Sequence, residues 1–117
     1  LMPGELTTDA LAFDVLAAGV AHAGDVPVLV VNEPIFIADG VNSDVRYNFF
    51  YPRWAYDAYR GTLRELAAAN GWLYLDAWDA VAPERFTNSA IHMDAAGSQT
   101  LAAMIAAELN ALWETVP

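Results

Sequence analysis

The chain contains no cysteine and no lysine, and each absence excludes some chemistry. Without cysteine there can be no disulfide, no thiolate metal ligand and no cysteine nucleophile. Five arginines stand against fifteen aspartates and glutamates, which gives a formal net charge of −10. Such a chain offers no basic patch to a nucleic-acid backbone or to an anionic membrane surface. We therefore expect neither nucleic acid nor a membrane among its partners.

Long apolar runs, a leader-like segment and metal-ligand spacings are also missing. No apolar stretch approaches the roughly 20 residues that cross a bilayer. The segment 1–5 has neither the basic nor the apolar region of a signal peptide, although one could precede it in a longer parent. No grouping of His, Asp and Glu has metal-ligand spacing, so we expect no metal site. A chain without cysteine tolerates either redox environment, so the sequence does not predict a compartment.

What the sequence does contain is enough apolar surface for one small domain. It has 117 residues, of which 56% are hydrophobic, and it shows no repeat or internal boundary. Apolar spacing and turn residues predict helices over about 7–23, 52–70 and 94–112, and strands over 27–31 and 72–75. In the second helix Arg60 and Arg64 are expected to face the solvent, and Asp94 is expected to cap the third helix.

Neither predicted strand alternates between apolar and polar residues, which suits strands buried on both faces of a parallel sheet. The order α-β-α-β-α implies two parallel strands joined by a helical crossover. Two strands that need cover on both faces do not make a sheet alone, and open sheets commonly have about four to six strands. We therefore expect residues 1–117 to be a single partial domain, the C-terminal half of a three-layer α/β/α sandwich with a parallel, flavodoxin-like sheet.

A long connection over about 35–51 separates the first strand from the second helix and is rich in aromatic residues. Connections of this length are commonly functional or mobile. Aromatic side chains exposed beside a pocket bind apolar or sugar faces, whereas the same side chains turned inward are core, and the sequence leaves both readings open. Arg46 and Tyr47 are candidate substrate-binding residues. Arg46 and Arg53 are the nearest cations for a carboxylate or phosphate, although a surface ion pair is the commoner role of a lone arginine.

Asn32 and Glu33 follow directly after the first predicted strand. Since ligands of open α/β sheets bind beyond the carboxyl ends of the strands, both are candidate substrate-binding residues. Glu33 is also a candidate acid partner for a histidine if the fold brings the two together. The alternative is that both residues cap the strand and satisfy amides of the following loop.

The most informative stretch is Phe86-Thr-Asn-Ser-Ala-Ile-His92-Met-Asp-Ala-Ala-Gly97, which contains one of the two histidines. His92 lies between the second predicted strand and the last helix, where an imidazole can face a pocket at the carboxyl end of the sheet. A structural role at the start of a helix is the alternative. The other histidine, His22, falls in the last turn of the first predicted helix, and we assign it no catalytic role.

This stretch resembles the last sequence block of the SGNH (GDSL-type) hydrolases, which supplies the catalytic histidine of an ester-cleaving triad. The family also has a glycine about five residues after its histidine, where this chain has Gly97. The runs 28–34 and 72–76 look like the two strands that precede this block. The resemblance covers about residues 10–112. It implies a serine esterase or acetylesterase-like hydrolase that acts on an O-acyl ester of a small molecule or glycan and needs no cofactor.

The resemblance makes His92 the general base, and the residue that orients it is the open question. The family has an acid three residues before its histidine, whereas this chain has Ser89 there and Asn88 one residue further back. Either residue is a possible orienting partner of the imidazole. Together with Thr87, both could equally cap a turn.

The family's nucleophile block, Gly-Asp-Ser, and its two oxyanion-hole blocks do not occur in this chain. The resemblance therefore implies a partner, the N-terminal half of the same domain, on the same or a separate chain. Two other classes stay open. An SGNH-like domain without the acid would bind a glycan or acylated ligand without turning it over, and a flavodoxin-like regulatory or structural domain would make His92 incidental.

Overall fold

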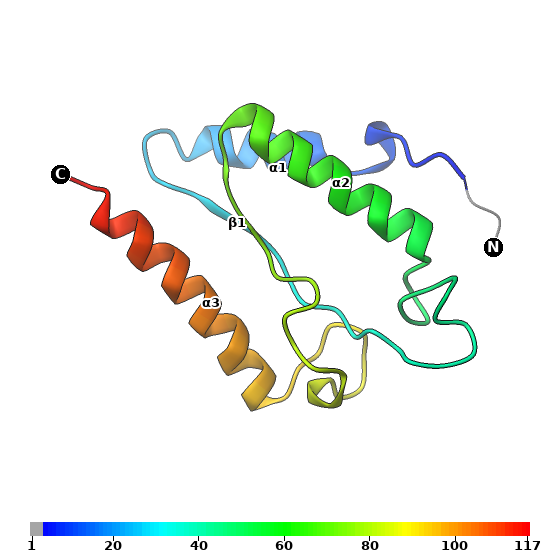
Figure 1. Ribbon diagram of the computed structural model, residues 1–117. Helices are drawn as coiled ribbons and strands as arrows, with labels where there is room; N and C mark the ends of the chain where they lie inside the picture. Colours follow the sequence, from blue (N-terminus) through cyan, green and yellow to red (C-terminus); the bar gives the residue numbers. More distant parts are fainter. Residues whose placement is uncertain (1–3) are drawn as a thin grey trace.

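A computed structural model describes residues 4–117 as three α-helices and two β-strands in the order α1-β1-α2-β2-α3 (Figure 1). The elements are α1 (Phe13–His22), β1 (Leu29–Asn32), α2 (Arg53–Asn70), β2 (Leu73–Asp76) and α3 (Ala95–Glu114). They are accompanied by two single turns of 3₁₀ helix, η1 (Thr8–Ala10) and η2 (Pro83–Arg85). The order of helices and strands is the one that the sequence predicts.

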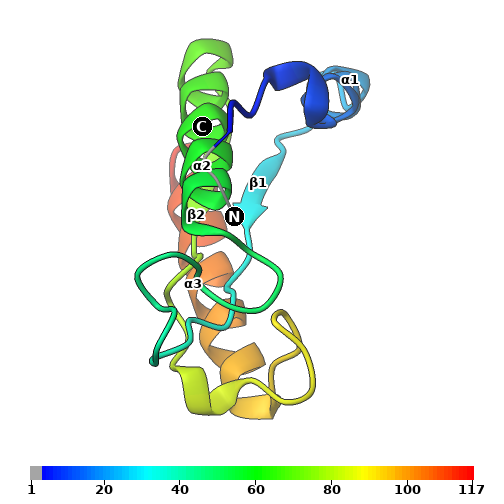
Figure 2. The same cartoon turned by 90° about the vertical axis from the view of Figure 1, so that its right-hand side faces the viewer.

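The two strands lie side by side and run parallel, in the register Leu29–Leu73 to Asn32–Asp76. This pairing confirms the predicted parallel strands joined by a helical crossover, here α2. Helices α1 and α2 lie on one side of the strands and α3 lies on the other (Figures 1 and 2). The chain is thus a mixed α/β structure built on a small two-stranded parallel sheet.

The side chains of successive residues of β1 point to opposite faces of the sheet. Val30 is buried against Phe13 of α1 and Leu63 of α2. The neighbouring residue Leu29 shares a cavity with Leu109 of α3. Because apolar side chains point both ways, the strand reads in the sequence as a continuous apolar run.

Helices α2 and α3 begin and end close to the predicted residues. Helix α2 follows Pro52 and stops at Gly71, whose φ of 67° is the left-handed conformation that favours glycine. Helix α3 follows Asp94, whose side chain accepts a hydrogen bond from the Gly97 amide at 2.8 Å. This contact confirms Asp94 as the predicted N-cap.

The first helix begins later than the sequence predicts. Residues Thr8–Ala10 form only a 3₁₀ turn, and the α-helix starts at Phe13. Thr7 makes no side-chain capping hydrogen bond, so the hydroxyl that suggested a helix start does not act as one. The predicted start over residues 7–9 was therefore wrong.

The connection between β1 and α2 contains neither a helix nor a strand, yet backbone hydrogen bonds hold it. The Ala38 amide donates to the Tyr47 carbonyl at 2.6 Å, and the Tyr47 amide donates to the Tyr51 carbonyl at 2.9 Å. An isolated antiparallel bridge joins Arg46 to Pro52 just before α2 begins. The connection is therefore a fixed loop that folds back on itself.

The aromatic residues of this connection divide between the two readings that the sequence leaves open. Tyr47 is buried and packs edge-on against Tyr56 and Trp78. Phe49 and Phe50 are instead 82% and 64% exposed. Some of these rings therefore belong to the core, and others stand on the surface.

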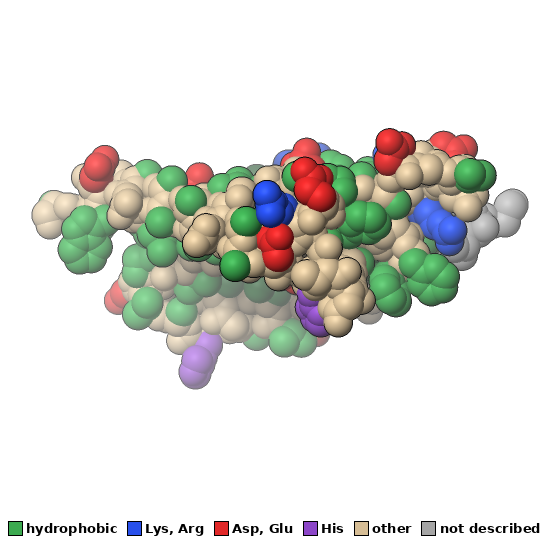
Figure 3. Space-filling view, turned by 90° about the horizontal axis from the view of Figure 1, so that it is seen from below, with side chains coloured by type: hydrophobic (Ala, Val, Ile, Leu, Met, Phe, Trp, Pro, Cys, Tyr) green, Lys and Arg blue, Asp and Glu red, His purple; other side chains and the backbone are tan. Residues whose placement is uncertain are grey.

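Considerable apolar surface remains uncovered on this small sheet and its helices. On α3, Leu109 and Trp113 are 47% and 79% exposed. The space-filling view shows hydrophobic side chains spread along much of the visible face (Figure 3). Within residues 4–117, no helix combines the length and the hydrophobicity needed to cross a membrane.

Candidate active site

The loop that carries His92 is closed by backbone pairing at its base. An antiparallel bridge joins Phe86 to Met93. Inside it, the Thr87 amide donates to the His92 carbonyl at 2.8 Å, and outside it the Asp94 amide donates to the Arg85 carbonyl at 2.7 Å. The segment 87–92 is therefore a tight turn between η2 and α3.

Asn88 is the side chain that contacts the His92 ring. Its Oδ1 lies 3.0 Å from the imidazole Nδ1. An amide oxygen accepts hydrogen bonds, so this contact places the ring proton on Nδ1. Nε2 is then the unprotonated nitrogen, and within the described residues it has no hydrogen-bond partner. The ring is exposed, so a reactant can reach Nε2 from the solvent.

Ser89 orders the turn and does not contact the ring. Its Oγ accepts hydrogen bonds from the Ile91 amide at 3.2 Å and from the His92 amide at 3.1 Å. Thr87 also orders the turn, because its Oγ1 donates to the His92 carbonyl at 3.2 Å. Of the two candidate orienting residues, the structure thus places Asn88 on the imidazole and Ser89 on the backbone.

Asp94 is the carboxylate nearest to His92 in the sequence, and it is engaged elsewhere. It caps α3 through the Gly97 amide and lies 3.3 Å from Arg85. The Gly97 hydrogen bond, with help from Arg85, holds the pKa of Asp94 below its usual range. This side chain therefore fixes the start of α3, two residues after the histidine.

Asn32 belongs to a polar network that joins the strand ends to α2. Its Nδ2 donates to Asp76 at 2.9 Å and to the Tyr56 hydroxyl at 3.3 Å, while its Oδ1 accepts from the Tyr59 hydroxyl at 3.4 Å. Asp76 also pairs with Arg60 at 2.7 Å. The Asn32 side chain is buried, and both ends of its amide are engaged. It is held in place as a support of the strand ends, and it also lines a cavity of about 630 Å³ together with Glu33.

The sequence does not predict Arg60 and Asp76 as members of this network. Arg60 was predicted to face the solvent, and that prediction was wrong, because its side chain is only 19% exposed. Its guanidinium lies 4.0 Å from the centre of the Trp78 ring while it pairs with Asp76. Burial by itself would raise the pKa of Asp76, but hydrogen bonds from Arg60 and Asn32 outweigh it and hold that pKa below its usual range.

Glu33 lines a cavity that extends between β1 and α3. The cavity has a volume of about 630 Å³ and is also lined by Ile91, the residue before His92, and by Leu101 and Ile105 of α3. The Glu33 side chain is exposed and makes no hydrogen bond to His92 within the described residues. The structure therefore places Glu33 and the histidine loop at one cavity without pairing them.

Arg46 and Tyr47 lie away from the His92 ring. The Tyr47 hydroxyl donates to Asp57 at 2.6 Å, and burial together with this bond raises the pKa of Tyr47. The Arg53 guanidinium covers the Tyr47 ring at 4.3 Å. Arg46 lies 6.0 Å from the Phe49 ring and lines a small cavity of about 210 Å³ within the connection. Tyr47 is a core residue, and Arg46 borders a cavity.

No nucleophile stands beside the histidine in residues 4–117. Ser43 lies in the connection, where its carbonyl accepts from Arg53, and Ser98 lies in the first turn of α3. Ser89 is the serine of the histidine turn, but its Oγ is bonded to backbone amides. In the same part of the chain, no three His, Cys, Asp or Glu side chains form a group that could hold a metal ion.

Comparisons with known proteins add no relative to this picture. No protein-family model, no curated protein and no solved structure matches the chain. What can be said of its function therefore depends on the residues of the His92 loop and their geometry.

Proposed function

We propose that this chain carries the general-base half of a serine ester hydrolase of the SGNH (GDSL) type, with His92 as the base and Asn88 as the residue that orients it. The observation that supports the proposal is the 3.0 Å contact between Asn88 Oδ1 and His92 Nδ1. This contact leaves Nε2 free to take the proton of a serine hydroxyl and later to return it to the leaving alcohol. The substrate is an O-acyl ester of a small molecule or glycan, and the reaction needs no cofactor.

The serine and the oxyanion hole come, in this proposal, from the N-terminal half of the same domain, on the same or a separate chain. A parallel sheet of two strands has two unpaired edges, and parallel strands are normally covered and paired within larger sheets. Helix α3 also keeps Leu109 and Trp113 exposed on this small scaffold. Further strands beside β1 or β2 would complete a three-layer α/β/α sandwich and cover such surface.

The proposal is tested with a fluorophosphonate probe, which modifies only serines that are activated as nucleophiles. In the complete hydrolase we expect one labelled serine outside residues 4–117. The substitution His92→Ala should abolish labelling and lower kcat by about 10²–10⁴-fold, the usual contribution of general-base catalysis. His22→Ala is the matched control, because it removes the other histidine, which is exposed at the end of α1. Labelling that persists unchanged in His92→Ala would refute the proposal.

A second candidate function is supported by the chemistry of Asn88 itself. An amide fixes the orientation and tautomer of the ring, but it carries no charge to stabilise the imidazolium that forms in catalysis. The same fold would then bind a glycan or an acylated ligand without hydrolysing it. Tight binding of an acylated sugar by a complete protein that no fluorophosphonate labels would favour this candidate over the hydrolase.

A further inference from the structure

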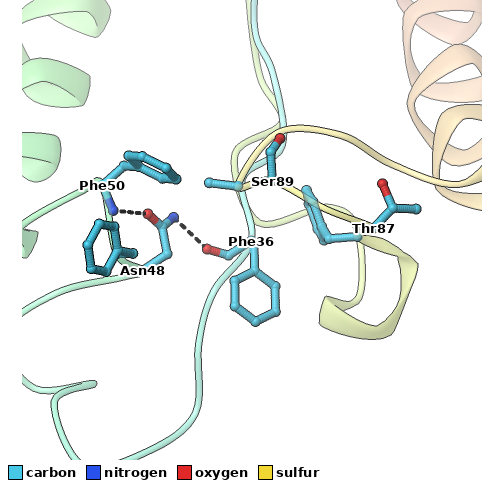
Figure 4. Close-up of a pocket in the computed structure, with 8 residues that line it drawn as sticks. Phe36, Asn48, Phe50, Thr87 and Ser89 are labelled. Atoms are coloured by element: carbon cyan, nitrogen blue, oxygen red, sulfur yellow. Dashed lines mark hydrogen bonds between the residues drawn. The ribbon is translucent and has the colours of Figure 1, made fainter.

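A second cavity of about 270 Å³ lies between the β1–α2 connection and the His92 turn (Figure 4). One wall consists of Phe36, Asn48 and Phe50 from the connection. The opposite wall includes Thr87 and Ser89 from the turn that carries His92. The cavity is therefore formed by two segments that lie about 40–50 residues apart in the sequence.

Hydrogen bonds fix the shape of this cavity before any ligand arrives. The buried Asn48 amide donates to the Phe36 carbonyl at 2.8 Å, and its Oδ1 accepts from the Phe50 amide at 2.9 Å. The Phe36 amide donates to the Ala90 carbonyl at 2.8 Å, which ties the two walls together. A preformed cavity of this kind spares a ligand the cost of ordering the loops.

The lining offers aromatic faces and few free polar groups. None of the residues around this cavity is charged, although the chain has a net charge of −10. Asn48 uses both ends of its amide, and Ser89 Oγ already accepts two backbone amides. Thr87 Oγ1 donates to the His92 carbonyl, so the capacity left at these two hydroxyls is the Ser89 O–H donor and the Thr87 lone pairs. A sugar ring needs several hydrogen-bond partners placed around it, so this lining suits an uncharged apolar group better than a glycan.

The size and the exposed rings point to an aromatic group. Phe36 and Phe86 meet edge to face with ring centres 5.9 Å apart, and Phe50 is 64% exposed at the cavity. An apolar cavity of about 150 Å³ is enough to hold benzene in a protein. The volume of about 270 Å³ found here leaves room for one ring and the link that joins it to an ester.

We propose that this cavity is a subsite for an uncharged aromatic ring of the ester substrate, a role that rests on the proposed hydrolase function. Because Thr87 and Ser89 belong to the same tight turn as His92, a ring seated between Phe36 and Phe50 brings its attached ester to the histidine loop. The ring belongs either to the acyl group or to the alcohol, and a comparison of methyl phenylacetate with benzyl acetate as substrates of the complete hydrolase separates these two sources.

Binding is tested with the 117-residue chain and N-benzylacetamide, a neutral amide that carries the ring but resists hydrolysis. Amide NMR shifts should change saturably at Phe36, Phe50 and Ser89, and N-methylacetamide, which lacks the ring, should leave them unchanged. Phe36→Ala should weaken binding about fivefold or more, since it removes an aromatic wall that the cavity of about 630 Å³ does not share. Trp113→Ala is the matched control, because it removes an exposed ring near the end of α3 and should not alter the affinity.

The inference is overturned by three results: no saturable shift, an unchanged affinity in Phe36→Ala, or shifts confined to Leu101 and Ile105 of the cavity of about 630 Å³. Phe36→Leu guards against a folding defect, because it keeps an apolar side chain at this position while removing the ring, and it should also weaken binding. Binding of the amide needs no nucleophile and should survive His92→Ala. Loss of hydrolysis with intact ring binding would therefore refute only the proposed function, and hydrolysis without any ring preference would refute only the subsite.

Discussion

At the scale of single residues, the pair formed by Asn88 and His92 is the feature with the clearest chemical consequence. The amide oxygen fixes the ring at 3.0 Å and directs the unprotonated nitrogen outward. What an amide does not supply is a negative charge beside the imidazolium. The proposed mechanism therefore predicts that the absence of a negative charge at position 88 limits the rate.

The substitution Asn88→Asp tests this prediction. A carboxylate at this position stabilises the protonated ring by direct attraction. The NMR titration midpoint of His92 should therefore move to higher pH, with His22 as an unaffected internal reference. In the complete hydrolase the same substitution should raise kcat, whereas Asn88→Ala should lower it. If neither the midpoint nor the rate responds to either substitution, residue 88 is not the functional partner of the histidine.

The ion pair between Arg60 and Asp76 leads to a prediction about stability and pH. The folded-state pKa of Asp76 lies below its ordinary value of about 3.9. The stability that the pair contributes is therefore fully present above that ordinary value and is lost as the pH falls through the lower folded-state pKa. Asp76→Asn should lower the free energy of unfolding at pH 7 by about 1–3 kcal/mol.

Urea titrations at a series of pH values provide the measurement. The difference between wild type and Asp76→Asn should shrink toward zero as the pH falls through the lowered folded-state pKa of Asp76. Asp79→Asn is the matched control, because Asp79 is exposed on the loop just after β2 and its substitution should change stability little. A difference that stays constant across the whole pH range would show that the charge of Asp76 is not what stabilises the fold.

Sequence patterns predicted some of these residues and missed others for physical reasons. Asn88 could be proposed because its partner lies four residues away in the same turn. Arg60 and Asp76 are 16 residues apart and meet only because the crossover helix packs on the strand ends. A helical pattern classifies a charged residue as outward-facing, and it cannot show that a half-buried carboxylate lies beneath it.

At the scale of elements, the start of α3 determines how the His92 loop is held. Gly97 is buried, and a Cβ placed on it would lie 3.0 Å from Met93 Cβ, 3.1 Å from Val81 Cγ1 and 3.2 Å from Arg85 Cβ. Met93 forms the bridge at the base of the His92 turn. The glycine thus allows η2, the histidine loop and α3 to approach one another closely.

Gly97→Ala should destabilise the chain by about 1–3 kcal/mol, the usual cost of overpacking a close contact. Gly61→Ala is the matched control in the interior of α2, where nothing lies within 4 Å of the added methyl group. That change should stabilise the chain by up to about 1 kcal/mol, since alanine is the better helix former. Urea unfolding of both variants measures the two effects. Equal and small changes in both would show that the packing around Gly97 is loose.

The elements themselves were largely predictable, because each depends on local signals. Gly71 and Asp94 mark helix ends by their own backbone and side-chain chemistry. The two apolar runs have the length of strands and are too short to be helices. The start of the first helix was predicted too early, because threonine often caps helices but Thr7 makes no capping hydrogen bond. The packing of the aromatic connection could not be predicted from the sequence, since the same residue types occur in buried and in exposed positions.

At the scale of the whole molecule, the proposed hydrolase is completed by further strands. The β1–β2 pair is the described sheet of residues 4–117, and helices lie on both of its sides. Apolar residues of α3 face a cavity of about 630 Å³ that reaches Val31 of β1 and the histidine loop. A strand added beside this pair would bring its carboxyl end to the same edge as Asn32, Asp76 and the His92 turn. This edge is where the proposal expects the serine.

The last prediction concerns the catalytic competence of the 117-residue chain. It should show no serine-dependent hydrolysis of p-nitrophenyl acetate, only the slow reaction of its exposed imidazoles, because a general base activates a serine only when the serine is held against it. Ser43 and Ser98 lie on other segments, and Ser89 is bonded to the backbone of its own turn. Each serine can be checked by its alanine substitution in a stopped-assay comparison with the parent chain. Hydrolysis by the pure chain that Ser43→Ala removes would mean that the nucleophile is already present, and that no second half is needed to complete the site.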